Sequence, residues 1–598
     1  MLLLSFWRLA VPLAAQPAAP TAVLTQHNDN ARSGANLTET QLNTNNVNTN
    51  QFGLLFTRAV DDQIYAQPLL MTNVSIPGKG THNIVYVATV NDSVYAFDAD
   101  DASVTTAYWT RSFINPPEIV APRNTDMTGA CGGNGNYKDF SGKMGIVGTP
   151  VIDPAGGTLY LVARTKEFGT NYVQRLCALD LATGADRPNS PVIIAATNSV
   201  PFDPYKQNQR PALLLANGYV YVAWSSHCDW TPYHGWLMGW NTANLLEPPV
   251  TFNDTPSGSQ AGLWMSNQGP AADTNGNVFL STGNGTFDGV SNFGESFLKL
   301  ANDGFTLSVA SWFTPYNYNS LNGSDQDLGT GGVLLIPGTS LMFSGGKAGT
   351  LYLVNRDNMG GLSGISADTN IVQSWSIGPH SIHGGPTWWA GPNGSFAYVW
   401  GASSDHLRQY QFTNHAAFNT TAVAVSTTTG GSGQPGGILS LSANGATAGS
   451  GIVWAAVNTS ADANQAVVAG TLHAYDAQHV AHELWNSAQL NARDSLGNFA
   501  KFVAPTVANG KVYMATFSGQ LNVYGLFPPP QLSVAISAGV LTLSWPTNSY
   551  LLHYLLQSSP ELMPPNWTNT TNTVTVNNGR YQVSVPARYA SAFYRLKQ

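Results

Sequence analysis

The stretch HNIVYVATVNDSVYAFDADD (82–101), followed by AYWTRSF (107–113), decides the fold of this chain. Short apolar runs lie on either side of a turn, and a further run with a Trp follows, which is the pattern of strands joined by tight turns. Units of the same design recur along the chain at 148–184, 210–241, 269–313, 331–377, 383–412, 436–486 and 504–526. A fixed repeat determines the architecture. This one predicts an all-β propeller with four-stranded blades.

The turns and the two ends of the repeat support this prediction. Asn217-Gly218, Asn275-Gly276 and Asn509-Gly510 join apolar runs, and Asn-Gly is the strongest short-range hairpin signal. The last unit lacks its fourth strand, whereas FGLLFTRAV (52–60) belongs to no unit. Pairing these segments would close the ring without an exposed sheet edge. We therefore expect eight blades over 24–526, or seven if the weak unit at 383–412 is an insertion.

Both ends of the chain differ from the repeat. The N-terminus, MLLLSFWRLAVPLAAQPAAP (1–20), is apolar and ends in small residues, which is typical of a signal peptide and too short to span a membrane. It predicts a secreted or periplasmic protein. A stiff proline linker, FPPPQ (527–531), follows the repeat. The runs after it predict a small β-sandwich over 532–598, which resembles C-terminal modules of secreted planctomycete and verrucomicrobial proteins in LTLSWP, LQSS and FYRLK.

Charge and cysteine content exclude several classes of function. Only 10% of residues are charged and the net charge is −8, with no basic run of the kind that nucleic-acid binding requires. The three cysteines, Cys131, Cys177 and Cys228, are too few and too far apart for a disulfide framework or a zinc site. Three buried thiols is the interpretation we favour, and one disulfide plus one free thiol is the alternative.

One region carries chemically suggestive residues in a fixed order. It comprises GLWMSNQGPAADTNGNVFLSTGNGTFD (262–288), GESFLKL (294–300), NGSDQDLGTGGVLL (322–335) and FSGGKAGTLYLVNRDNMG (343–360). The order of Trp264, Asn284, Asp325, Asp327 and Lys347 resembles that of the quinoprotein alcohol dehydrogenases, eight-bladed propellers that bind pyrroloquinoline quinone (PQQ). QHNDNARSGANLTETQLNTNNVNTNQFG (26–53) resembles the start of the same family.

The resemblance implies oxidation of an alcohol or sugar hydroxyl by PQQ. Trp264 would be the floor on which the planar quinone stacks. Lys347 would bind a quinone oxygen through charge-assisted hydrogen bonds. Asp325 would be the general base that takes the proton of the substrate hydroxyl.

The resemblance also implies a Ca²⁺ or lanthanide ion held by oxygen ligands. Asn284 and Asp327 would be two of its ligands. The family's metal-binding Glu should fall within SSHCDWTPYHGW (225–236), which has no Glu, so Asp229 is the candidate replacement. Three further departures are the absence of the family's adjacent cysteine pair, the replacement of a nearby Arg around His234, and the sequence Thr-Phe-Asp (286–288) after the GTGN element.

Two alternatives remain open at this stage. The propeller could be a non-catalytic extracellular module that binds a glycan or a protein, in which case the five side chains of the quinoprotein pattern should not converge. Alternatively, imidazoles from several blades could hold copper or zinc. That set comprises His227, His234, His380, His383 and His406. Elemental analysis for transition metals would test this second alternative.

Overall fold

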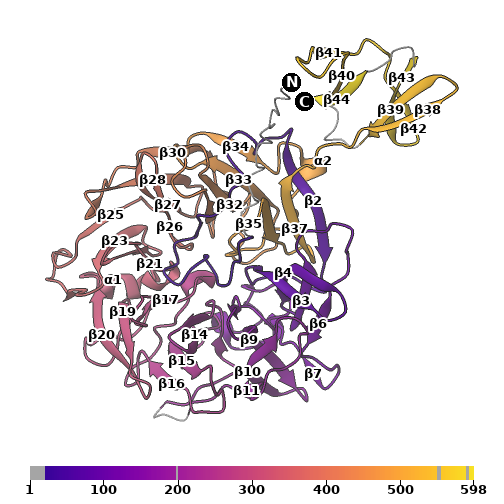
Figure 1. The fold of residues 1–598 in the computed structure, drawn as a ribbon. Coiled ribbons are helices and arrows are strands. Elements are labelled where there is room, and N and C mark those ends of the chain that lie inside the picture. Colours follow the sequence, from indigo (N-terminus) through magenta and orange to yellow (C-terminus); the bar gives the residue numbers. More distant parts are fainter. Residues whose placement is uncertain (1–19, 197–199, 548–553, 587–591, 598) are drawn as a thin grey trace, which may run out of the picture.

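The computed structural model describes residues 20–196, 200–547, 554–586 and 592–597. The predicted signal peptide, apart from its last residue, lies outside these ranges. Within them the α-helices are short, α1 (Tyr318–Gly323) and α2 (Asn491–Asp494), and none is long and apolar enough to cross a membrane. Strands dominate, as the composition predicts. Figure 1 shows them as radial sheets around a common centre.

Eight sheets follow one another around the ring in the described residues between 35 and 526. The first consists of β3 (Leu69–Ile76), β4 (Gly80–Thr89), β5 (Ser93–Asp98) and β6 (Trp109–Ser112). The second consists of β7 (Ile119–Val120), β8 (Val151–Asp153), β9 (Thr158–Glu167), β10 (Asn171–Asp180) and β11 (Val192–Ile193). The third consists of β12 (Gln207–Asn208), β13 (Leu214–Ala216), β14 (Tyr219–Ser226), β15 (Trp236–Asn241) and β16 (Val250–Asn253). The fourth consists of β17 (Ala271–Ala272), β18 (Val278–Ser281), β19 (Phe297–Asn302), β20 (Leu307–Thr314) and β24 (Gly361–Leu362).

The remaining four sheets have the same antiparallel core. The fifth consists of β21 (Leu334–Leu335), β22 (Leu341–Gly345), β23 (Thr350–Asn355) and β25 (Gln373–Ser376). The sixth consists of β26 (Thr387–Gly391), β27 (Gly394–Trp400), β28 (His406–Thr413), β29 (Ala417–Phe418) and β30 (Ala424–Thr429). The seventh consists of β1 (Ala35–Asn36), β31 (Ile438–Ser442), β32 (Ile452–Asn458), β33 (Gly470–Asp476) and β34 (Glu483–Asn486). The eighth consists of β2 (Phe52–Ala59), β35 (Thr506–Ala508), β36 (Lys511–Ala515) and β37 (Gln520–Leu526).

The ring closes where the N-terminal strand β2 pairs antiparallel with β37, from Phe52 opposite Leu526 to Ala59 opposite Gln520. This is the pairing that the unmatched segment 52–60 predicts. Closure joins the two ends of the repeat by main-chain hydrogen bonds, so the last sheet gains its outer strand and β37 is paired on both sides.

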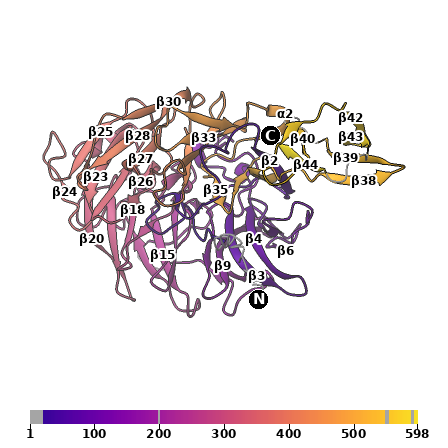
Figure 2. The ribbon, with the colours of Figure 1, turned by 45° about the horizontal axis from the view of Figure 1, so that its top comes forward.

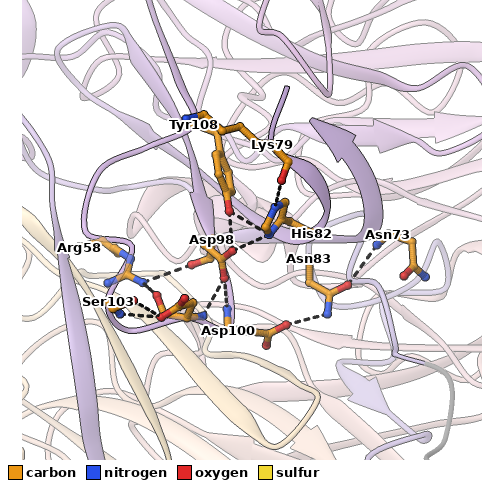
Figure 3. A network of polar contacts seen from close by, with 10 residues as sticks. Arg58, Asn73, Lys79, His82, Asn83, Asp98, Asp100, Ser103 and Tyr108 are labelled. Atoms are coloured by element: carbon orange, nitrogen blue, oxygen red, sulfur yellow. Dashed lines mark hydrogen bonds and ion pairs between the residues drawn. The ribbon is translucent and has the colours of Figure 1, made fainter. Parts of the chain in front are cut away.

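A polar network holds the seam between the eighth and first sheets (Figure 3). Arg58 of β2 donates from Nη2 to the carbonyl oxygen of Asp101 at 2.7 Å. Asp98, at the end of β5, accepts from Tyr108 Oη at 2.7 Å and lies 3.0 Å from His82 Nδ1. Its other oxygen accepts the N–H groups of the following turn, at 2.8 and 2.7 Å. The acidic turn at 98–101 therefore orders the chain at the closure point.

A buried tyrosine ties several neighbouring sheets together in the same way. Tyr86, Tyr398 and Tyr513 each lie in the second strand of a sheet and donate from Oη to a main-chain carbonyl of the next sheet. The acceptor is always the residue after the Asp that ends the third strand, at 2.6 to 3.0 Å. A buried hydroxyl needs a hydrogen-bond partner. This hydrogen bond therefore explains why Tyr recurs in the second strand of one sheet and Asp at the end of the third strand of the next sheet.

The segment from Val23 to Asn36 runs around the centre of the ring (Figure 1). It forms hydrogen bonds with the innermost strand of every sheet, in chain order. The partners are Leu70, Ile152, Leu215, Ala272, Leu335, Trp388, Leu441 and Val507, at 2.7 to 2.9 Å. We call residues 23–36 the central N-terminal segment. It joins the sheets to one another at the axis, which side-by-side packing of sheets alone does not do.

Two small sheets follow the ring. They consist of β38 (Ser533–Ser537), β39 (Val540–Pro546), β42 (Thr575–Asn577) and β43 (Arg580–Pro586), and of β40 (Leu555–Ser559), β41 (Thr568–Asn569) and β44 (Phe593–Lys597). Leu543, Trp545 and Val583 of one sheet share a small core with Leu556 of the other. Figures 1 and 2 show this module at the side of the ring, near β2.

Candidate functional site

A cavity of about 240 Å³ lies where loops from most of the sheets converge at the centre of the ring. Its lining comprises Asp139, Arg210, Cys228, Asp229, Trp264, Ser266, Asp325, Asp327, Thr330, Lys347, His383, Gln434, Asn464, Gln465 and Phe502. Small-molecule pockets are usually concave, with a few convergent polar groups in roughly 300–1,000 Å³. This cavity is slightly smaller and more polar, and it suits one compact polar ligand.

Lys347 is the centre of a charged cluster on one wall of the cavity. Its Nζ lies 2.8 Å from Asp325 Oδ1 and 2.7 Å from Asp327 Oδ2. Burial acts to lower the pKa of Lys347, but the two carboxylates outweigh it and hold that pKa above its ordinary value. The Asp327 side chain is 5% exposed and the Asp325 side chain 68% exposed. Asp325 is therefore the carboxylate that a bound molecule can reach.

Asn284 connects the same two carboxylates from the fourth sheet. Its main-chain N–H donates to Asp327 Oδ1 at 2.8 Å, and its Nδ2 donates to Asp325 Oδ1 at 2.9 Å. The amide oxygen Oδ1 of Asn284 is buried and has no hydrogen-bond partner among the described residues. Asp325, predicted as the base, and Lys347 are thus in direct contact with two of the predicted metal ligands, Asn284 and Asp327.

The Trp264 side chain is half-buried and packs against the main chain of two glycines, Gly262 and Gly283. A Cβ atom added at Gly262 or at Gly283 would lie 2.9 Å from its indole ring. These two glycines therefore let the indole approach the backbone closely. The indole Nε1 finds no hydrogen-bond partner within the part of the chain that the structure describes. This arrangement provides a fixed aromatic surface beside Lys347 and Asp327.

Asp229 lies on the same cavity, beside a disulfide bond. Tyr233 donates from Oη to Asp229 Oδ1 at 2.5 Å. Burial, followed by the charge of Asp327, raises the pKa of Asp229 to about 6. Cys228 and Asp229 both have φ near +50°, an uncommon conformation for residues other than glycine. The neighbouring side chains and the disulfide hold this turn in place.

The prediction of three free thiols was wrong. Cys131 and Cys228 form a disulfide across 97 residues of sequence, and Cys177 stays a buried free thiol. The repeat brings the loop between β7 and β8 of the second sheet next to the loop between β14 and β15 of the third, which the linear spacing does not reveal. The disulfide attaches the segment that carries Asp139 to the cavity wall.

Sequence reasoning missed Arg210 and Glu295. Arg210 is buried, its guanidinium carbon lies 4.2 Å from the ring centre of Phe502, and Nη2 has no partner among the described residues. Glu295 is fully buried behind Asp327, and its Oε2 accepts the N–H of Leu328 at 2.7 Å. Burial and the charge of Asp327 raise the pKa of Glu295. The GES sequence at 294–296 was visible, but nothing in its spacing indicated burial.

The predicted histidine set does not come together. His383 lines the cavity, and burial together with the charges of Lys347 and Arg210 lowers its pKa to about 3. His234, His380 and His406 each place Nδ1 against a main-chain carbonyl, at 2.8 to 3.2 Å. Across the described ranges, no three His, Cys, Asp or Glu side chains form a group that could hold a metal ion.

His227 is engaged in a separate buried network. Arg164 Nη1 lies 2.6 Å from its Nε2, and Tyr137 Oη lies 2.7 Å from its Nδ1. An arginine can only donate, so Nε2 accepts and Nδ1 carries the proton. Burial and Arg164 lower the pKa of His227, in agreement with a neutral ring. Its lone pair is already used, so this imidazole is not available to a metal.

The residues predicted as ligands of Ca²⁺ or a lanthanide do not fit such an ion in this arrangement. Ca²⁺ takes six to eight oxygen ligands at about 2.3–2.6 Å. Here both oxygens of Asp327 accept hydrogen bonds, one from Asn284 and one from Lys347. Asp229 accepts from Tyr233. The ammonium group of Lys347 already offsets one of the two carboxylate charges that the ion would need.

A planar molecule rich in acceptor atoms fits the cavity better. Trp264 offers a flat surface, and Lys347 brings a positive charge to the same wall. Within the described chain, Trp264 Nε1, Arg210 Nη2 and His383 Nε2 are buried polar atoms that lack a partner. Two of the three can only donate. Carbonyl or carboxylate oxygens are the partners that these two donors lack.

Comparison with known proteins identifies the fold and nothing finer. No family model matches the chain, and no curated protein matches it in sequence. The solved structure of the quinohemoprotein alcohol dehydrogenase from Comamonas testosteroni matches with a TM-score of 0.50 and 13% identity, over 86% of this chain and 83% of the other. A quinohemoprotein alcohol dehydrogenase from Pseudomonas putida gives the same values. The chain has a quinoprotein-like β-propeller fold. At 13% identity this likeness shows the fold alone.

Proposed function

We propose that the protein is a quinoprotein-like oxidoreductase that oxidises an alcohol or sugar hydroxyl. One observation carries the proposal: Trp264, Asp325, Asp327 and Lys347, which are spread over 84 positions of sequence (264 to 347), line one cavity. Asn284 contacts both aspartates. A binding or scaffold module would have no need to bring these residue types together, so the convergence favours an enzyme over that alternative.

Each residue has a chemical role in this proposal. Trp264 stacks on a planar quinone, while Lys347 and Arg210 donate to its oxygens. Asp325 is the accessible carboxylate of the cluster and takes the proton of the substrate hydroxyl. When bound, PQQ supplies the acceptor for the hydride. Asp327, held by Asn284 and Lys347, fixes the position of the ammonium group relative to Asp325.

The proposal is tested by titrating the purified full chain with PQQ and then assaying reduction of an artificial dye with alcohols and sugars. We expect saturable quenching of tryptophan fluorescence and substrate-dependent turnover. Asp325→Asn should lower turnover roughly 100- to 10,000-fold, the usual contribution of a general base, with PQQ binding retained. Asp303→Asn, in an exposed hairpin far from the cavity, is the matched control. Absence of PQQ binding at high micromolar concentration would end the proposal.

Three further predictions accompany this function. We propose that each of the eight sheets is one blade, that the two sheets after residue 531 form a β-sandwich module, and that the protein is secreted or periplasmic.

Binding of a glycan or a protein partner stays a prediction, with no feature of the cavity in its favour. Elemental analysis would test the copper alternative, and stoichiometric copper would revive it.

A further inference from the structure

The charged cluster of the site is centred on Lys347. Its Nζ is shared by Asp325 and Asp327 at 2.8 and 2.7 Å. Its main-chain N–H also donates to the carbonyl oxygen of Asp327 at 2.9 Å. The side chain is only 19% exposed. Side chain and main chain together hold the ammonium group between the two carboxylates, so it is not a mobile surface charge.

Asn284 turns its donor atoms, not its carbonyl oxygen, toward the same carboxylates. Its Nδ2 and its main-chain N–H point to Asp325 and Asp327. An amide oxygen in that place would repel the carboxylate, so the hydrogen bonds fix which way the amide faces. Asn284 Oδ1 is therefore directed away from the carboxylate oxygens, and the three residues cannot present their oxygens to one common cation without rearrangement.

The positive charge of Lys347 also opposes binding of a metal ion between the two carboxylates. A divalent or trivalent ion bound between Asp325 and Asp327 would have to displace the ammonium group or lie beside it in a partly buried site. Like charges at such short range repel strongly where water is scarce. The described residues contain no cluster of three His, Cys, Asp or Glu suited to a metal at this or any other place.

We infer that Lys347 is the resident cation of this site, in the place of a metal ion, and that the cavity takes its planar, acceptor-bearing ligand without a metal. The inference rests on the proposed function for the identity of the ligand, but not for the absence of a metal. On this inference, Lys347 is the residue that determines whether the site binds a metal ion. Removal of its charge should leave Asp325 and Asp327 without a counter-charge and allow the Asn284 amide to turn, so that the site gains affinity for a cation.

Metal binding is measured on the full chain by elemental analysis for Ca and lanthanides and by titration with Tb³⁺, whose emission Trp264 can sensitise at short range. The native protein should hold substoichiometric metal and give no saturable Tb³⁺ emission. Lys347→Met should gain Tb³⁺ affinity by about tenfold or more, because its aspartates lose their counter-charge. Lys347→Arg should stay like the native protein. Lys299→Met, which removes a lysine 3.9 Å from Asp357, is the control and should gain nothing.

One stoichiometric Ca²⁺ or lanthanide ion in the native protein would overturn the inference, as would a folded Lys347→Met variant that gains no affinity for Tb³⁺. Circular dichroism establishes that the variant is folded, and Lys347→Arg provides a second test should it not be. The PQQ titration is read separately. A metal-free native protein that also fails to bind PQQ would refute the proposed function and leave the role of Lys347 intact.

Discussion

Two buried arginines, one in the central N-terminal segment and one at the cavity, differ in how completely their guanidinium groups are hydrogen-bonded. Arg32, in the central N-terminal segment, has an acceptor for each of its guanidinium nitrogens: Thr25, Gln26, Pro270 and Leu213 at 2.6 to 3.1 Å. Arg210, on the cavity, donates from Nε to Asn267 at 3.3 Å, and its Nη2 lacks a partner among the described residues. A buried polar group with all its partners stabilises the fold, whereas one on a cavity wall that lacks a partner can still bind a ligand or water.

The largest effect is expected from removing the satisfied arginine. Arg32→Met leaves the main-chain carbonyls of Gln26, Leu213 and Pro270 without their buried donor. Each buried acceptor left without its donor costs about 1–3 kcal/mol, so losing the donor of three carbonyls should cost at least about 3 kcal/mol. We expect the free energy of unfolding, measured by urea denaturation, to fall by that amount. A loss under about 1 kcal/mol would show that the central N-terminal segment does not hold the sheets together.

The disulfide should have the next largest effect, because it attaches the Asp139 segment to the cavity wall. Cys131→Ser with Cys228→Ser should lower the free energy of unfolding by about 2–4 kcal/mol, the usual contribution of such a cross-link. Hydrogen exchange in the loop around Cys131 should also accelerate. Cys177→Ser, at the buried free thiol, serves as the control for loss of a cysteine and should leave that exchange unchanged.

A pH effect is expected at Lys501, which is buried beside Phe502 and donates to the carbonyl oxygen of Asn464. Burial, followed by the charge of Arg210, lowers the pKa of Lys501 to about 7. The unfolded state binds more protons than the folded state between that pH and the ordinary lysine pKa. The free energy of unfolding should therefore rise with pH there, by up to about 1.4 kcal/mol per pH unit. Lys501→Met should flatten this rise, and an unchanged slope in that variant would contradict the assignment.

The smallest effect on stability should come from the unsatisfied arginine. Arg210→Met loses one weak hydrogen bond and keeps its packing on Phe502, so we expect a change within about 1 kcal/mol. PQQ binding should nevertheless weaken, because the variant removes a donor from the cavity. A large loss of stability with unchanged PQQ binding would reverse the comparison between the two arginines.

Sequence alone indicated the strand repeat and named the residues that meet around Lys347. Strand and turn patterns are local, so the hairpins at Asn217 and Asn509 were readable, and the unpaired segment 52–60 indicated how the ring closes. The convergence of Trp264, Asp325 and Lys347 followed from a resemblance that keeps these residues in order along the blades. Their hydrogen bonds and burial could not be predicted, because these depend on several loops packing at once.

Contacts between distant parts of the sequence could not be predicted where no periodic pattern links them. Cys131 and Cys228 meet only because two loops of neighbouring sheets share one end of the ring. The central N-terminal segment has no strand pattern, yet it bonds to every sheet. Arg210 and Phe502 both lie in irregular segments between strands, where the sequence gives no sign of burial. The same reason explains why the metal hypothesis did not anticipate the position of the Lys347 ammonium group.

A crystal structure of the protein grown with PQQ and Ca²⁺ tests the central claim most directly. The account predicts planar density against the Trp264 indole, with acceptor oxygens within hydrogen-bond reach of Lys347 and Arg210. It also predicts no metal peak between Asp325 and Asp327, where the ammonium group should remain. Density for an ion at that position, or a cavity that holds only water while Trp264 Nε1 and Arg210 Nη2 stay unpaired, would contradict it.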